Sequence, residues 1–221
     1  MRLRQKPWAD REFAENPRFI ARPKALMGNW SGLFGNDNEI HLEIGCGKGR
    51  FILQNALQNP QINYVAMEKF ERILCMALRL TREFDLPPNL YFFHEDAANL
   101  PQIFAENELN RIYINFPDPW RAKGKWRKRR LTHRNFLAVY ENIMAAGASK
   151  TGQVHFKTDD MTLFCFSIAE FEECGWQLSN ITYNLLKDGA DGNIMTEYEE
   201  KFVQKGMKIC RLEAVIRRGG L

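Results

Sequence analysis

The sequence lacks the cysteine and histidine patterns that hold disulfide frames or structural metals. Its five cysteines are odd in number and scattered, and no two of them form a Cys-x-x-Cys pair. Its four histidines show no spacing typical of metal ligands. These absences argue against a zinc site and against a small fold held by disulfides. We therefore expect a protein of the reducing cytoplasm that binds no metal.

Long apolar runs are missing as well. No stretch approaches the roughly 20 residues that span a membrane, and the basic N-terminus is not followed by the apolar segment of a secretory signal. The chain has 221 residues, of which 45% are hydrophobic and 26% charged, as in ordinary soluble globular proteins. This length suits one α/β domain with a substantial core. Because no long apolar run is present, we expect no contact with a membrane.

The segment from Arg121 to Arg130 contains no acidic residue and many basic ones. Seven of the ten residues from Arg121 to Arg130 are Lys or Arg, and without these seven charges the net charge of +4 would become −3. A concentrated basic strip on a nearly neutral body indicates a binding surface for a polyanion. The alternative is a solvated face without a partner.

A glycine turn follows an apolar strand predicted at residues 40–44. Gly45, Gly47 and Gly49 have the spacing Gly-x-Gly-x-Gly, which differs from the Gly-x-Gly-x-x-Gly of dinucleotide-binding proteins. Glu43 lies two residues before the first glycine, where it would repel a pyrophosphate and attract a cation. S-adenosyl-L-methionine carries an ammonium and a sulfonium but no phosphate, and it fits this arrangement.

A second acid supports the same ligand. Glu68 follows the strand predicted at 62–67, and an acid at this point can accept hydrogen bonds from ribose hydroxyls. Glu43, Gly45, Gly47 and Glu68 therefore predict an adenosylmethionine site. The alternative is a ligand-free turn in which Glu43 pairs with a lysine.

Strands alternate with helices along most of the chain, which predicts a largely parallel sheet.

We expect residues 1–39 to form a basic, aromatic arm with a short helix near 10–15, and residues 40–221 to form one domain. Thr132 is predicted to cap the helix at 134–144, and Phe70 to lie on the buried face of the helix at 70–84. The remaining strands are predicted at 90–94, 111–116, 153–157, 176–183 and 207–217, and the remaining helices at 50–57 and 161–174.

Acids recur where the predicted strands end. Asp96, Asp118 and Asp159 join the two glutamates, which gives five acids at successive strand ends. Ligands of open α/β sheets lie outside these carboxyl ends. Asp96 is followed by two alanines and is predicted to bind the adenine amine, although it could instead be a helix N-cap.

The loop after the fourth predicted strand is rigid by composition. Pro117 and Pro119 flank Asp118 and fix the backbone around it. Trp120 follows and could stack on a base or anchor the loop. Since the basic strip begins at the next residue, this loop is suited to a site that modifies a base in a nucleic acid.

Several segments together resemble the bacterial tRNA (guanine-N7)-methyltransferases. They are Leu42–Gly49, Asn115–Trp120, Lys128–Thr132, His155–Asp159 and Thr196–Phe202. The resemblance implies an α/β, Rossmann-like class I methyltransferase fold, with helices on both faces of a mostly parallel seven-stranded sheet whose last strand is antiparallel. It also implies methyl transfer from S-adenosyl-L-methionine to N7 of guanine 46 in the tRNA variable loop.

The resemblance also implies roles for particular residues. Asp159, Thr196 and Glu199 would hold the target guanosine. Separately, we hypothesise that Asp118, fixed by its two prolines, is the catalytic residue and also contacts the cofactor. Thr196 and Glu199 also have the spacing of a helix capping box. The family's substrate lysine falls on Lys123, with Lys125 as the alternative, because the stretch after Trp120 departs from the usual Pro-Lys-Lys-Arg-His.

The expected reaction needs no deprotonating side chain. Guanine N7 has a free in-plane lone pair that can attack the methyl carbon directly, so the site must chiefly align the reactants. Two other functions remain open at this point. One is a class I methyltransferase for another RNA or a small molecule, and the other is a non-catalytic tRNA-binding subunit. The sequence does not decide between a monomer and a homodimer.

Overall fold

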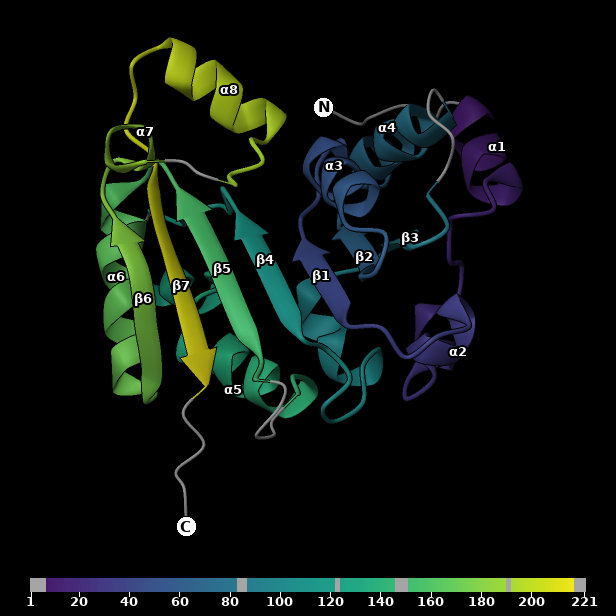
Figure 1. Ribbon diagram of the computed structural model, residues 1–221, viewed down its shortest axis with the longest axis horizontal. Coiled ribbons are helices and arrows are strands. Elements are labelled where there is room, and N and C mark those ends of the chain that lie inside the picture. Colours follow the sequence, from purple (N-terminus) through teal and green to yellow (C-terminus); the bar gives the residue numbers. More distant parts are fainter. Residues whose placement is uncertain (1–6, 83–86, 122–123, 146–150, 190–191, 217–221) are drawn as a thin grey trace.

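The computed structural model describes residues 7–82, 87–121, 124–145, 151–189 and 192–216. Within these residues seven strands form one sheet in the order β3-β2-β1-β4-β5-β7-β6. All neighbouring strands are parallel except β7, which runs antiparallel to β5 and β6 (Figure 1). The predicted fold class is thus confirmed. The strands are β1 (Ile40–Ile44), β2 (Asn63–Glu68), β3 (Leu90–His94), β4 (Arg111–Asn115), β5 (Gln153–Thr158), β6 (Trp176–Thr182) and β7 (Cys210–Ile216).

The strand order places the chain's two most distinctive loops side by side. From β1 the chain moves outward through β2 to β3, then returns to the other side of β1 as β4. Ile44 at the end of β1 is in register with Ile114 near the end of β4. The glycine turn after β1 and the proline-rich loop after β4 therefore diverge from adjacent strand ends, where open α/β sheets bind ligands.

Helices cover both faces of the sheet. In the view of Figure 1, α3 (Arg50–Gln58) lies in front of the sheet, and α5 (Arg134–Ile143) and α6 (Met161–Glu173) lie behind it. Helix α4 (Glu71–Arg82) contacts α3, and α1 (Pro7–Glu15) packs on α4. Leu42 of β1 packs in the core on the α5–α6 side. Because side chains alternate along a strand, its neighbour Glu43 faces the α3 side.

The segment before β1 packs against the sheet. It contains the 3-10 turn η1 (Pro23–Leu26) and the short helix α2 (Trp30–Phe34). Trp30 is fully buried, its Nε1 donates a hydrogen bond of 3.0 Å to the carbonyl of Ile103, and its ring stacks on Phe104 at 5.1 Å. The described part of this segment thus contributes directly to the main core.

Two local predictions are wrong. Thr132 does not cap α5, because its hydroxyl is buried against that of Ser167 at 2.7 Å, and His133 caps the helix instead, its Nδ1 accepting from the Asn135 amide. Phe70 precedes α4 and is 59% exposed. The structure also contains η2 (Ala97–Gln102), η3 (Gly124–Arg129), α7 (Leu185–Asp188) and α8 (Glu197–Gln204). None of the described helices is long and apolar enough to cross a membrane.

Candidate active site

The glycine turn combines open backbone with close packing. Gly45, Gly47 and Gly49 all have positive φ, at 76°, 58° and 79°. A Cβ added at Gly45 or Gly47 would have no atom within 4 Å, whereas at Gly49 it would lie 2.9 Å from the Cβ of Ala77. The first two glycines therefore leave the backbone accessible to a ligand. The third allows α3 to pack closely on α4.

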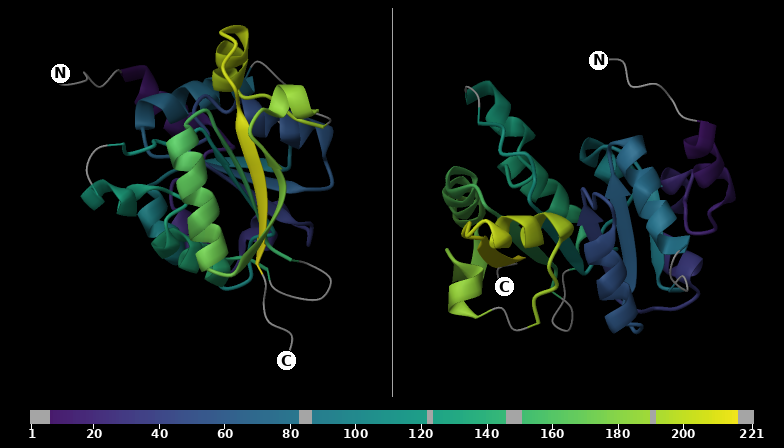
Figure 2. Two further views of the ribbon diagram at one scale, coloured as in Figure 1. Left: turned by 90° about the vertical axis from the view of Figure 1, so that its left-hand side faces the viewer. Right: turned by 90° about the horizontal axis from the view of Figure 1, so that it is seen from above.

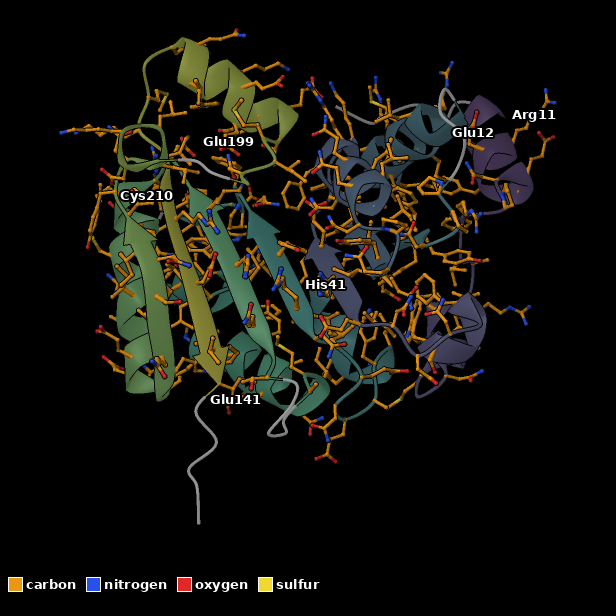
Figure 3. The ribbon with its side chains drawn as sticks, viewed as in Figure 1. Arg11, Glu12, His41, Glu141, Glu199 and Cys210 are labelled. Carbon is orange, nitrogen blue, oxygen red and sulfur yellow. The ribbon has the colours of Figure 1, made fainter. Side chains whose placement is uncertain are left out.

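A cavity of about 300 Å³ lies over this turn. Its floor is the segment from Gly45 to Phe51, one wall is Asn115 with Phe116, and its roof is the first turn of α8. Figures 2 and 3 show α8 projecting beyond the strand ends, with Glu199 on the side of the helix that faces the sheet. The predicted site thus has a roof from a distant part of the chain.

Glu43 lies in the wall of this cavity. It is 2% exposed, and its Oε1 accepts a hydrogen bond of 2.9 Å from Nδ2 of Asn115. Its Oε2 is buried and has no hydrogen-bond partner within the described residues. Burial raises the pKa of Glu43 to about 8. Lys157, whose charge acts on Glu43, pairs with Glu199 instead, and no ion pair between Glu43 and a lysine is present within the described residues.

Glu68 holds the turn in shape. Its Oε2 accepts a hydrogen bond of 3.1 Å from the Gly47 amide, and its Oε1 accepts one of 2.9 Å from the Phe70 amide. A carboxylate has about four acceptor positions. Glu68 can therefore fix the glycine turn and still accept hydrogen bonds from a ligand, and its predicted contact with ribose stays a prediction.

Asp96 is an N-cap, as the alternative interpretation of the sequence suggested. Its Oδ1 accepts a hydrogen bond of 3.0 Å from the Ala98 amide at the start of η2, and its Oδ2 lies 2.6 Å from Nζ of Lys69. Burial raises the pKa of Asp96, but the Ala98 amide, Lys69 and the charge of Arg129 together lower it below its ordinary value. The contact with adenine stays a prediction.

Asp118 lies two residues after Phe116, which lines the cavity, in a segment with an unusual backbone. Phe116 and Trp120, on either side of the Pro-Asp-Pro segment, have positive φ at 50° and 44°, which is rare for large side chains. The Phe116 amide donates to the carbonyl of Lys157 at 2.8 Å, which fixes the loop to β5. Asp118 is exposed, and within the described residues its carboxylate makes no ion pair. Its acceptors therefore remain available to a ligand.

The basic strip divides into two groups of residues. Arg130 is 4% exposed, with its Nε donating to the carbonyl of Pro119 at 2.9 Å, and Arg121 forms an ion pair of 2.6 Å with Asp160. Both hold the loop in place. Arg127 and Lys128 are exposed and make no ion pair within the described residues. The sequence alone did not distinguish these two groups.

Neither candidate for the substrate lysine has a described side chain. Lys123 lies outside the described residues. Lys125 belongs to η3, but only its backbone is described. Trp120, for which we considered base stacking or loop anchoring, packs within the loop: its ring stacks on that of Trp126 with centroids 5.9 Å apart.

Asp159 and Asp160 are adjacent but act differently. Asp160 caps α6, accepting from the Leu163 amide at 2.7 Å, and also binds Arg121. Asp160 was not among the residues predicted from the sequence, although an acid just before a helix is a common capping signal. Asp159 is half-buried, and burial together with its charge raises the pKa of Tyr198 on α8. Its charge is therefore close enough to act on Tyr198, a residue of the cavity's roof.

Thr196 and Glu199 form the capping box that their spacing indicated. The Thr196 hydroxyl accepts from the Glu199 amide at 2.9 Å, and the Glu199 carboxylate accepts in return from the Thr196 amide. Glu199 is completely buried, and its Oε2 lies 2.7 Å from Nζ of Lys157 while its Oε1 accepts from Asn193. Lys157 was not singled out from the sequence, because only the fold shows its proximity to Glu199.

Two ion pairs connect α8 to the glycine turn. Nζ of Lys48 lies 2.7 Å from Oε1 of Glu197, and the Arg50 guanidinium lies 2.6 Å from Oε2 of Glu200. The ring of Phe116 also contacts that of Tyr198 at 5.0 Å. The roof of the cavity is thus attached to both its floor and its wall.

The chain is similar to known proteins in sequence and in fold. A family model described as "Putative methyltransferase" matches residues 37–212. The tRNA (guanine-N(7)-)-methyltransferase of Geobacillus sp. (strain WCH70) is 45% identical over 214 residues, which are 96% of this chain and 94% of that protein. The protein of that name from Bacillus subtilis (strain 168) is 44% identical over 214 residues, 96% and 98% of the two chains.

Solved structures agree on the fold. The crystal structure of a 16S rRNA methyltransferase, KamB, superposes with a TM-score of 0.63 at 15% identity, covering 86% of this chain and 93% of that one. A SAM-dependent methyltransferase from Aquifex aeolicus gives a TM-score of 0.56 at 10% identity, covering 97% and 100%. At such identities the likeness establishes the class I methyltransferase fold alone.

Proposed function

Because this chain belongs to the family of tRNA (guanine-N(7)-)-methyltransferases, we propose that it methylates N7 of guanine in tRNA, at position 46 of the variable loop, with S-adenosyl-L-methionine as the methyl donor. The similarity over nearly the full length of both chains carries this proposal. The position within the tRNA rests on the resemblance of the motifs described above.

The cavity over the glycine turn suits this cofactor. Gly45 and Gly47 leave open space above the backbone, and the unpaired Oε2 of Glu43 offers an acceptor to a cationic group. We assign Glu43, Gly45, Gly47, Glu68 and Asp96 to cofactor binding, with Asp118 at the edge of the same pocket. When bound, the cofactor supplies an electrophilic methyl group on a positively charged sulfur.

Asp118 is the residue we assign to catalysis. Its exposed carboxylate is fixed by two prolines and can accept hydrogen bonds from the N–H groups of guanine, which orients N7 without removing a proton. A fixed negative charge also stabilises the positive charge that develops on the ring as N7 is alkylated. Alignment of this kind can contribute roughly 7–11 kcal/mol to lowering a barrier.

We assign two different roles in guanosine binding to the residues in and near α8. Asp159 is half-buried beside Tyr198 and is the acid we assign to direct contact. The carboxylate of Glu199 is used by Lys157 and by the capping box with Thr196, so we assign these two residues to positioning the first turn of α8. Lys123 stays a predicted substrate contact outside the described residues.

The exposed part of the basic strip supports binding of a polyanion. Arg127 and Lys128 lie on η3, after the catalytic loop, and are exposed and available to phosphates. Phosphate contacts of this kind supply affinity that falls as salt is added. They position the RNA, while the loop around Asp118 contacts the base.

The proposed function is tested with methyl-labelled S-adenosyl-L-methionine and two matched tRNA transcripts, one with guanine in the variable loop and one with adenine at that position. We expect label on the first alone, and strand scission at the labelled position after treatment that cleaves at N7-methylguanosine. Label on both transcripts would retain methyl transfer and remove the assigned position. No label on either, with cofactor binding intact, would contradict the proposal.

A further inference from the structure

Three planar side chains form one cluster beside the catalytic loop. The rings of Trp120 and Trp126 stack with an interplanar angle of 19° and centroids 5.9 Å apart. The Arg129 guanidinium lies over both rings, 4.9 Å from the centroid of Trp120 and 4.3 Å from that of Trp126. We call these three residues the stacking platform.

The platform lies next to the proposed catalytic residue. Trp120 is two residues from Asp118, and two residues of chain span at most roughly 7 Å. The charge of Arg129 acts on Asp96, which is assigned to the cofactor pocket. The platform therefore lies beside the proposed catalytic residue, and the charge of Arg129 is close enough to act on Asp96.

Other contacts among the described residues also anchor the loop. That task is performed by Arg130, which donates to Pro119 and packs on Phe166 at 4.4 Å, and by Arg121, which pairs with Asp160. Both tryptophan rings nevertheless remain half-exposed, in a segment whose other described side chains are cations. Half-exposed aromatic rings among cations are the composition of surfaces that bind unpaired nucleic-acid bases.

We propose that the stacking platform binds an unstacked RNA base next to the target guanine, with Trp126 as a main contact. The inference rests on the proposed function and adds a second base contact to it. An aromatic face accepts any base, so the contact orients the strand and does not select its sequence. Arg127 and Lys128, on the same turn, supply the adjoining phosphate contacts.

Trp126 lies in the stretch that departs from the usual motif of the family, so the platform is a property of this chain that the resemblance does not supply. A base held there would keep the strand extended at the catalytic loop. The target guanine would then remain outside the RNA stack while N7 reacts.

The test is a double-mutant cycle between protein and RNA. Wild type, Trp126→Leu and Trp126→Phe are compared for affinity to the tRNA transcript and to transcripts in which a base on either side of the target guanine is replaced by an abasic nucleotide. Tyr183→Leu, which removes a 49% exposed ring outside the site, is the control. Cofactor affinity and thermal midpoint are measured for every variant.

We expect Trp126→Leu to weaken binding of the intact transcript about tenfold, Trp126→Phe to weaken it less, and Tyr183→Leu to leave it unchanged. The effect of Trp126→Leu should disappear on one of the abasic transcripts, because the ring and the base act as a pair. The number of ions released, read from the salt dependence, should stay constant because no charge is removed.

Two results would overturn the inference. One is wild-type affinity in Trp126→Leu, and the other is an equal loss on intact and abasic transcripts, which would indicate a structural role of the ring. Failure of the proposed function is distinguishable, since it would appear as absence of methyl transfer in the wild type.

Discussion

Lys157 and Glu199 form a buried ion pair of 2.7 Å that joins β5 to α8. Glu199 has no exposed surface, and the same lysine also donates to Asn193 and to the carbonyl of Ile194. Burial lowers the pKa of Lys157, and the charge of Glu199 raises it again in part. One buried cation therefore holds the segment that places the roof of the cofactor pocket.

Removing one partner of this pair should destabilise the protein. Glu199→Gln leaves the ammonium of Lys157 buried without a counter-charge, and losing one member of a buried pair typically costs about 3–5 kcal/mol. Urea unfolding of Glu199→Gln, Lys157→Met and the double variant measures this cost. We expect the double variant to be more stable than Glu199→Gln, and a strictly additive loss would contradict the assigned pairing.

Asp118→Ala should abolish turnover while changing the affinity for the cofactor only a few-fold. The exposed carboxylate has no structural partner among the described residues, so the fold should not change. The comparison is Asp37→Ala, an exposed acid before β1, at the opposite edge of the sheet. Methyl transfer under single-turnover conditions and cofactor titration separate the two effects. Near-normal turnover in Asp118→Ala would exclude Asp118 as the catalytic residue.

Cofactor affinity should increase with pH through the titration of Glu43. Burial raises the pKa of this acid to about 8, so the free protein carries it protonated at neutral pH. A cationic ligand favours the carboxylate, and binding therefore releases a proton. Below pH 8 the affinity should rise as the pH rises, and above it the rise should level off.

Glu43→Gln is the matched variant for this titration, because its amide has nearly the same shape and does not ionise. Calorimetric titration from pH 6 to pH 9 in two buffers of different ionisation enthalpy counts the protons released. The difference between wild type and Glu43→Gln cancels the titration of the ligand itself. Equal pH dependence in both proteins would show that Glu43 does not ionise on binding.

The ion pairs of Lys48 and Arg50 with α8 should affect kinetics more than stability. All four side chains are between 31% and 46% exposed, and exposed pairs contribute only about 0–1 kcal/mol each. In the double variant Lys48→Met/Arg50→Met we expect a small change in thermal midpoint and a several-fold faster release of cofactor in stopped-flow measurements. Arg11→Met, which breaks the exposed pair with Glu15, should leave release unchanged.

Salt dependence should separate the two groups within the basic strip. Removing a side chain that binds one phosphate lowers the slope of log affinity against log salt by about 0.7–0.9. Lys128→Met should show this smaller slope at unchanged stability. Arg130→Met removes a buried guanidinium and its bond to Pro119, so it should lower the thermal midpoint. A uniform change of slope along the strip would contradict the division.

The fold could be predicted because the sequence patterns that indicate it involve residues close together in the chain. The alternation of strands and helices and the acids at the strand ends depend on neighbours in the chain, and each predicted strand is present to within three residues at either end. The missed helix cap shows the limit of this approach. Thr132 has the right chemistry for a cap, but the tertiary contact with Ser167 uses its hydroxyl and leaves the cap to His133.

The site was predicted less completely, because much of it depends on contacts between distant segments. Glu43 and Glu68 could be placed by their strands. The partner of Glu199 could not, because Lys157 lies 42 positions away in the chain. The division of the basic strip into exposed and loop-anchoring residues could not be predicted either, because Arg127 and Arg130 differ only in their neighbours in the folded chain.

The roof of the pocket is made from residues that leave the ribosome long after its floor. Lys48 and Glu197 are 149 positions apart, and β7 must enter between β5 and β6, which are both synthesised earlier. A nascent chain that ends before residue 196 has the glycine turn but no helix to cover it. A chain that carries the glycine turn but ends before residue 196 therefore lacks the side chains of Thr196, Glu197 and Tyr198 that roof the cavity.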